Sequence, residues 1–163
     1  MKRYPLHTLL RLREHRTEMA RQLVLERQRA VQACREAIER IEHEILDLCD
    51  LREGQRARLL EPPPAGADWS TVLARREAHI DWLGMQIEAA RQRLAQAHQA
   101  LQEAEQALAQ AREAFFRAKA RQDALEKRQD AWRGEQRALE DRREEDAVAD
   151  LLLARGHLAR QSH

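Results

Sequence analysis

Apolar side chains recur at alternating spacings of three and four residues through the C-terminal half of the chain. The members of this series are Ile80, Leu83, Ile87, Ala90, Leu94, Ala97, Leu101, Ala104, Leu108, Ala111, Phe115 and Ala118. Such spacing is the heptad pattern of a coiled-coil helix, whose first and fourth positions face the partner helix. Most of the fourth positions hold alanine, which lets a partner helix approach closely. The pattern predicts a long second helix over about 70–153.

The N-terminal half repeats the same spacing less regularly. Apolar residues seven apart are followed by others at the intermediate positions: Val24, Val31, Ile38 and Ile45, with Cys34, Ile41 and Leu48 between them. An earlier apolar stripe lies in a different register: Leu9, Leu12, Met19 and Leu23. This shift indicates a stutter, which locally relaxes a supercoil. Because Pro5 is tolerated in a first helical turn, the pattern predicts a first helix over about 6–60.

One stretch, EPPPAGADWS at 61–70, interrupts the helical pattern. Three consecutive prolines cannot continue a helix, Gly66 can adopt a positive φ, and Asp68 or Ser70 can cap the next helix. A short loop returns the second helix beside the first in the antiparallel direction. The sequence therefore predicts an all-α protein: a single antiparallel coiled-coil hairpin with its tip at 61–69. Gly156 suits a helix end, so a C-terminal tail is expected over 154–163.

The short loop also suggests a register for the two helices. It would place Leu60 opposite Ser70 and Leu10 opposite Ala120, leaving the second helix unpaired after about residue 120. The seam positions there become polar, at Gln122, Gln129 and Gln136. The alternate positions stay apolar at Leu125, Trp132 and Leu139, and they predict a narrow stripe on a C-terminal helical overhang that binds another surface.

Composition narrows the class of protein. The chain has 163 residues, with 29 Lys plus Arg and 28 Asp plus Glu, so it has no net positive field to hold nucleic acid. Two lone cysteines, Cys34 and Cys49, suggest a reducing compartment. No apolar run approaches the roughly 20 residues that cross a bilayer. We expect a cytoplasmic protein without direct membrane insertion.

Catalytic chemistry is not indicated by any motif. The histidines are isolated, metal-ligand spacings are missing, and no glycine-rich loop could hold a phosphate. We therefore expect no enzymatic activity, no cofactor and no metal. Cys34 is expected to pack as a small hydrophobe, with a redox role as the alternative. For Trp132, docking to a partner and packing within the chain are equally compatible with the sequence.

The order of the parts resembles a known family. The N-terminal RYPLHTLLRLREHR, two Arg/Gln/Glu/Ala-rich helices, the central break PPPAGADW and the C-terminal RREEDAVADLL follow one another along nearly the whole chain. This organisation resembles the YscO and HrpO proteins of type III secretion and their flagellar relative FliJ. The resemblance implies a central stalk, similar to the γ subunit of rotary ATPases, that sits in the hexameric secretion ATPase and links it to the export gate. It also implies possible binding of secretion chaperones.

The resemblance implies two contact surfaces. The open end, where both termini lie, is expected to face the ATPase through Arg11, Arg13, Arg16, Leu125, Trp132, Arg133, Arg137, Leu139, Arg142 and Arg143. The tip is expected to face the cytoplasmic domain of the export gate through Leu48, Leu51, Trp69, Val72, Leu73 and Arg76. A stalk of this kind would be a monomer in isolation, located at the cytoplasmic side of the inner-membrane secretion apparatus. The alternative is a self-associating coiled-coil scaffold or tether without an ATPase partner.

Overall fold

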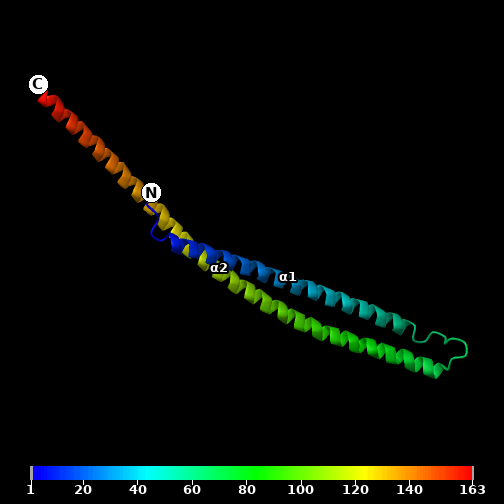
Figure 1. The fold of residues 1–163 in the computed structure, drawn as a ribbon. Coiled ribbons are helices and arrows are strands. Elements are labelled where there is room, and N and C mark those ends of the chain that lie inside the picture. Colours follow the sequence, from blue (N-terminus) through cyan, green and yellow to red (C-terminus); the bar gives the residue numbers. More distant parts are fainter. Residues whose placement is uncertain (1, 163) are drawn as a thin grey trace. The chain divides into compact units, whose positions relative to one another are not determined.

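The chain forms two helices joined by one loop (Figure 1) in a computed structural model that describes residues 2–162. Helix α1 is His7–Ala57, with 51 residues, and helix α2 is Trp69–Gln161, with 93 residues. No strand is present in this described range. The tertiary contacts divide into two compact units: unit 1 combines the residues up to Arg21 with those from Glu113 on, and unit 2 is Gln22–Arg112. The prediction of a single domain stays a prediction.

Unit 2 contains a close-packed seam between α1 and α2. Leu83, Ile87 and Ala90 are 2%, 1% and 0% exposed, and Val31 and Ile38 of α1 are also buried. Ion pairs join the two helices at Arg35 with Glu105 and at Glu44 with Arg93. Since moving forward along α1 from the first pair to the second means moving back along α2, the helices are antiparallel. The predicted all-α antiparallel hairpin is confirmed.

The loop at 58–68 contains the expected turn residues. Gly66 has a φ of 84°, a left-handed conformation that favours glycine. Asp68 caps α2, because its Oδ2 accepts two hydrogen bonds from Thr71: one from the backbone N–H at 3.3 Å and one from the Thr71 hydroxyl at 2.9 Å. Helix α1 ends at Ala57, a few residues before the predicted boundary. Proline disfavours helical geometry in the residue before it, so the chain leaves the helix ahead of Pro62.

Arg76 of α2 binds the end of α1. Its Nη1 donates to the carbonyl oxygens of Arg58, Leu59 and Glu61 at 3.2, 3.1 and 2.8 Å. These carbonyls belong to the first residues of the loop, directly after α1, and a cationic side chain is favourable at the C-terminal end of a helix. This single guanidinium therefore holds the start of the loop, where the chain leaves α1, against α2.

The pairing register differs from the predicted one by about one heptad. With Leu10 opposite Ala120, Glu44 would lie opposite Gln86, but its carboxylate pairs with Arg93. Arg76, and not Ser70, lies at the end of α1. The physical cause is the loop: three prolines keep the chain extended, so it runs past the end of α1 before Gly66 turns it back (Figure 1).

The pairing register in unit 1 also differs from the predicted one. The rings of Tyr4 and Trp132 lie 5.5 Å apart between centroids, which places Leu10 level with residues near 126. Leu10 and Leu125 are 4% and 8% exposed. The prediction that α2 is unpaired from about residue 120 is therefore wrong, and Gln122 and Gln129 are half-buried.

The predicted stutter in α1 is also absent. Thr17 is buried, seven residues after Leu10, and its hydroxyl donates to the carbonyl oxygen of Arg13 at 2.9 Å. The four residues assigned to a second register are exposed: Leu9 at 36%, Leu12 at 43%, Met19 at 52% and Leu23 at 37%. The heptad that holds Val31 thus continues through Thr17, because the internal hydrogen bond offsets the cost of burying a hydroxyl.

Helix α2 continues beyond the predicted end. It passes through Gly156 to Gln161, in the segment for which a tail was expected. A glycine within a helix costs only about 1 kcal/mol relative to alanine, and it ends a helix by adopting a left-handed conformation, which Gly156 does not do. Every residue over 137–162 is exposed, so this part of α2 has no covering helix within unit 1. Neither α1 nor α2 is long and apolar enough, as far as residues 2–162 are concerned, to span a bilayer.

Candidate functional site

A hollow in unit 1 lies where the chain enters α1 and meets α2. Its volume is about 490 Å³, and Tyr4 and Trp132 form an apolar floor, with their ring planes tilted by 54°. Tyr4 is 8% exposed, and its buried hydroxyl has no hydrogen-bond partner within residues 2–162. Tilted aromatic pairs of this separation attract each other through their ring quadrupoles. The contact therefore anchors the N-terminal segment before α1 to α2.

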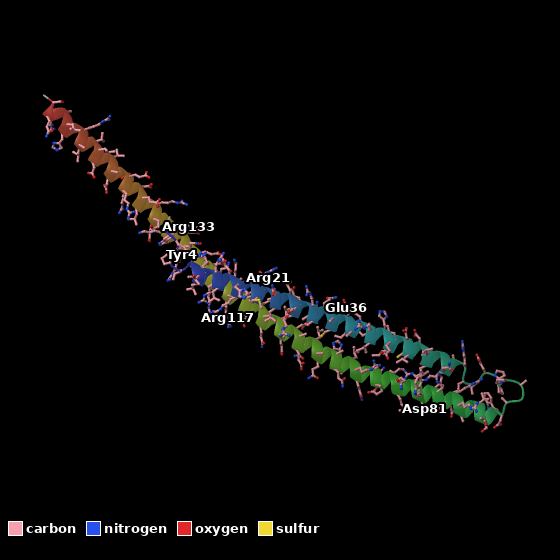
Figure 2. All side chains as sticks on the ribbon, in the orientation of Figure 1. Tyr4, Arg21, Glu36, Asp81, Arg117 and Arg133 are labelled. Carbon is pink, nitrogen blue, oxygen red and sulfur yellow. The ribbon has the colours of Figure 1, made fainter. Side chains whose placement is uncertain are left out.

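Basic side chains surround this aromatic pair. The charged residues that line the hollow are Lys2, Arg3, Arg133, Arg137 and Glu140. Four of these five are cationic, whereas the chain as a whole has a net charge of only +1. Figure 2 shows Tyr4 and Arg133 at this position. The hollow thus combines an apolar floor with a positive rim.

A second basic cleft in unit 1 contains arginines from both helices. Arg13 and Arg16 of α1 lie beside Arg117 and Arg121 of α2, with alanines between them, around a space of about 240 Å³. Arg117 also pairs with Glu113 at 3.6 Å. Sequence reasoning selected Arg13 and Arg16 and missed the two arginines of α2, although the predicted register already placed Arg117 opposite Arg13. Pairing the two helices residue by residue is the signal that could have found this cleft.

The structure places the predicted ATPase-facing residues in three different environments. The exposed ones are Arg11, Arg16, Arg133, Arg137, Leu139, Arg142 and Arg143. Arg13 and Trp132 are half-buried. Leu125 is 8% exposed and packs within the helix pair, so the predicted apolar stripe is wrong at this residue. Trp132 packs on Tyr4, which is one of the two roles that the sequence left open, and it also lines the hollow. Docking of Trp132 to a partner stays a prediction.

The predicted tip residues also divide by exposure. Leu51 and Trp69 are 56% and 38% exposed, whereas Leu48, Val72 and Leu73 are half-buried. Arg76 has an internal role, since it binds the end of α1 and lies 5.9 Å from the centroid of the Trp69 ring. An arginine over an indole face is a cation–π contact, which restricts both side chains. Sequence reasoning assigned Arg76 to a partner and missed this role.

Ion pairs on the surface shift the pKa of three groups. Hydrogen bonding to Arg93 lowers the pKa of Glu44, and the same contact raises the pKa of Arg93. Hydrogen bonding to Glu18 likewise raises the pKa of Arg21. All three groups are solvent-exposed, so these pairs position side chains and contribute little stability.

Ligands for a metal ion do not converge among residues 2–162, where no group of three or more His, Cys, Asp or Glu side chains comes together. Cys34 and Cys49 are free and half-buried. What the arrangement offers is surface for binding: the hollow, the arginine cleft and the exposed part of α2.

Comparisons with known proteins agree with this fold. The profile of a family described as "YscO-like protein" matches residues 1–155. The solved structure of CT670 from Chlamydia trachomatis, a proposed YscO homolog, superimposes with a TM-score of 0.75 at 20% sequence identity, and the match covers 100% of both chains. At this identity the likeness shows the fold alone. A search of curated proteins gave no significant match. Because the family profile covers almost the whole sequence, the chain belongs to the YscO-like family, which is associated with type III secretion.

Proposed function

We propose that this protein is the central stalk of a bacterial type III secretion system, seated in the hexameric secretion ATPase and linking it to the export gate. The observation that carries the proposal is the family match over residues 1–155. The exposed arginines of unit 1 support it, because Arg133, Arg137, Arg142 and Arg143 remain accessible to a partner. A stalk in this place works at the cytoplasmic side of the inner-membrane apparatus.

The two paired helices explain how such a stalk would act without catalysis. Two antiparallel helices have no six-fold symmetry, so they present different side chains to the six subunits of a ring. A contact that differs between subunits favours one nucleotide state in one subunit and another state in the next. The stalk thereby biases ATP hydrolysis by differential binding.

The tip of unit 2 is the surface that we assign to the export gate. Leu51 and Trp69 are large apolar side chains that stay exposed there, and tryptophan is enriched at binding hot spots. Arg76 supports this surface from within by holding Trp69 and the end of α1. Handing over empty secretion chaperones is a further task that a protein in this position could perform, as its family resemblance implies.

Stimulation of the ATPase tests the first contact. We expect reversal of four exposed charges, Arg133→Glu, Arg137→Glu, Arg142→Glu and Arg143→Glu, to abolish binding to the purified hexamer and its stimulation. The matched control reverses four exposed arginines of unit 2: Arg27→Glu, Arg29→Glu, Arg40→Glu and Arg91→Glu. Equal stimulation by both variants would refute the proposed ATPase contact.

Binding to the export gate tests the second contact. Leu51→Ser combined with Trp69→Ala should weaken binding to the cytoplasmic gate domain, because both side chains are accessible apolar anchors. Leu46→Ser is a matched control, since Leu46 is 61% exposed and lies outside the assigned surface. Unchanged gate affinity of the double variant would contradict the assignment.

A self-associating scaffold is the second candidate function, and one observation favours it. The C-terminal part of α2 exposes Val148, Leu151, Leu152, Leu153 and Leu158 at 56–68%, an apolar surface that a second copy could cover. Light scattering at micromolar concentration separates the two functions. The stalk predicts a monomer in isolation, and the scaffold predicts a stable dimer.

A further inference from the structure

The hollow of unit 1 has an apolar floor that an inserted side chain would fit. Its volume of about 490 Å³ lies within the usual range for sites that take small ligands or single side chains. Tyr4 and Trp132 meet there at 5.5 Å and are packed against each other, so the floor is preorganised. Binding to it would therefore need little ordering of the protein.

The rim of the same hollow favours anionic groups. Lys2, Arg3, Arg133 and Arg137 add four positive charges at the rim, and no ion pair within the described chain neutralises them. A ligand that brings both an apolar group and carboxylates would satisfy the floor and the rim together.

Glu140 helps to identify the kind of ligand. Its carboxylate belongs to the same lining as the four cations, and it would repel a compact polyphosphate. A peptide, in contrast, carries backbone N–H donors that a carboxylate can accept, beside acidic side chains for the arginines. The combination of rim charges fits an acidic peptide better than a phosphorylated small molecule.

We propose that this hollow binds an acidic peptide segment of a partner protein, with one aromatic or aliphatic side chain of that segment inserted against Tyr4 and Trp132. The inference rests on the proposed function and deepens it, since it names the chemistry that the ATPase-facing unit recognises. Arg133 and Arg137 hold the carboxylates of the segment, and Glu140 accepts its backbone amides.

Tryptophan fluorescence of the full chain tests this proposal. The chain has three tryptophans, so Trp69→Phe with Trp82→Phe leaves Trp132 as the only reporter. The probe is a synthetic fluorescein-labelled peptide, EEEEFLEEEE, followed by anisotropy and, in unlabelled form, by Trp132 emission. We expect saturable binding that changes the emission of Trp132. Peptides with serine in place of glutamate, or with two alanines in place of Phe-Leu, should bind at least about tenfold more weakly, because each lacks one of the two attractions.

Charge reversal at the rim tests where the peptide binds. The double variant Arg133→Glu, Arg137→Glu should bind the acidic peptide at least about tenfold more weakly than the parent. The control, Arg155→Glu with Arg160→Glu, makes the same charge change at exposed positions of α2 outside the hollow, and its affinity should stay within about twofold of the parent. Circular dichroism confirms that both variants keep their helices.

Several outcomes would overturn the proposal. These are equal affinity for the acidic and the serine peptides, an unchanged Trp132 signal at saturation, equal loss in the two arginine variants, and displacement of the peptide by an equimolar amount of inorganic triphosphate. Concentration-dependent dimerisation that blocks the peptide would identify a second copy as the occupant and would also overturn it. Peptide binding without ATPase stimulation would leave this inference standing and refute the proposed function. Normal ATPase stimulation without peptide binding would refute this inference and leave the proposed function standing.

Discussion

Two stretches of α2 contain similar apolar side chains in opposite surroundings. In unit 2, Leu83, Ile87 and Ala90 follow heptad spacing and are almost fully buried. In unit 1, Leu151, Leu152 and Leu153 are consecutive and are 63–68% exposed. Helix α1 begins at His7, and Tyr4 just before it already lies beside Trp132, so no residue of α1 reaches the level of 151–153. The comparison teaches that the reach of α1, and not the number of leucines, decides where α2 is covered.

The largest expected effect follows from truncating a buried seam residue. Ile87 is 1% exposed, so Ile87→Ala removes apolar contacts and leaves a cavity, and should lower the free energy of unfolding by about 2–4 kcal/mol. Leu152→Ala, at an exposed position, should change it by less than about 0.5 kcal/mol. Urea unfolding followed by circular dichroism measures both. Equal losses would show that the two stretches do not differ as described.

Enlarging an alanine sharpens the same comparison. Ala90 is 0% exposed because the helices approach closely there, so Ala90→Leu should force them apart and cost about 1–3 kcal/mol. Ala149→Leu, at an exposed position of the same helix, should be close to neutral. A neutral Ala90→Leu variant would contradict the close approach of the two helices in unit 2.

Replacing a glycine by alanine should have opposite effects in the loop and in the uncovered part of α2. Gly66→Ala places a Cβ at a φ of 84° and should destabilise the protein by about 1–2 kcal/mol. Gly156→Ala should raise local helix stability by about 0.5–1 kcal/mol, since Gly156 lies within α2. Thermal unfolding measures the first change, and helix content measures the second. A lower helix content in Gly156→Ala would mean that α2 ends there after all.

The smallest effect concerns pH. Because Arg93 lowers the pKa of Glu44 below 4.5, the folded state binds the Glu44 proton less readily than the unfolded state. The pair therefore contributes its stability above that value and loses it as the pH falls through the folded pKa. Glu44→Gln should reduce the difference in unfolding midpoint between pH 7 and pH 3 slightly, and salt should hide the effect. Glu103→Gln, at an exposed position, is the matched control.

Local features of the fold could be predicted from the sequence. The seam at Leu83, Ile87 and Ala90 follows from periodicity along one helix, and the cap at Asp68 and the turn at Gly66 follow from the chemistry of single residues. Each of these signals comes from residues that are close together in the sequence, so it can be recognised without knowing how the two helices pair. The family resemblance likewise depended on the order of segments along the chain.

The register could not be predicted, and the reason is physical. A heptad seam looks the same after a slide of seven residues, so the apolar pattern does not distinguish neighbouring registers. The loop selects one of them, and its path depends on how far the prolines extend. Two errors at the site came from this slide: Leu125 was placed on an exposed stripe, and the contact of Tyr4 with Trp132 was not foreseen. Arg117 and Arg121 were missed for another reason, since the predicted register already placed Arg117 opposite Arg13.

Amide hydrogen exchange of the isolated protein along α2 tests the central claim most directly, namely that α1 and the segment before it cover α2 as far as Trp132 and not beyond. Helical amides without a partner helix open readily, whereas those in a packed seam open only with the surrounding structure. We predict slow exchange in peptides up to Trp132 and exchange faster by orders of magnitude in peptides over 138–161. Protection that already ends near residue 120, or that continues unchanged to Gln161 in a dilute monomer, would contradict the account.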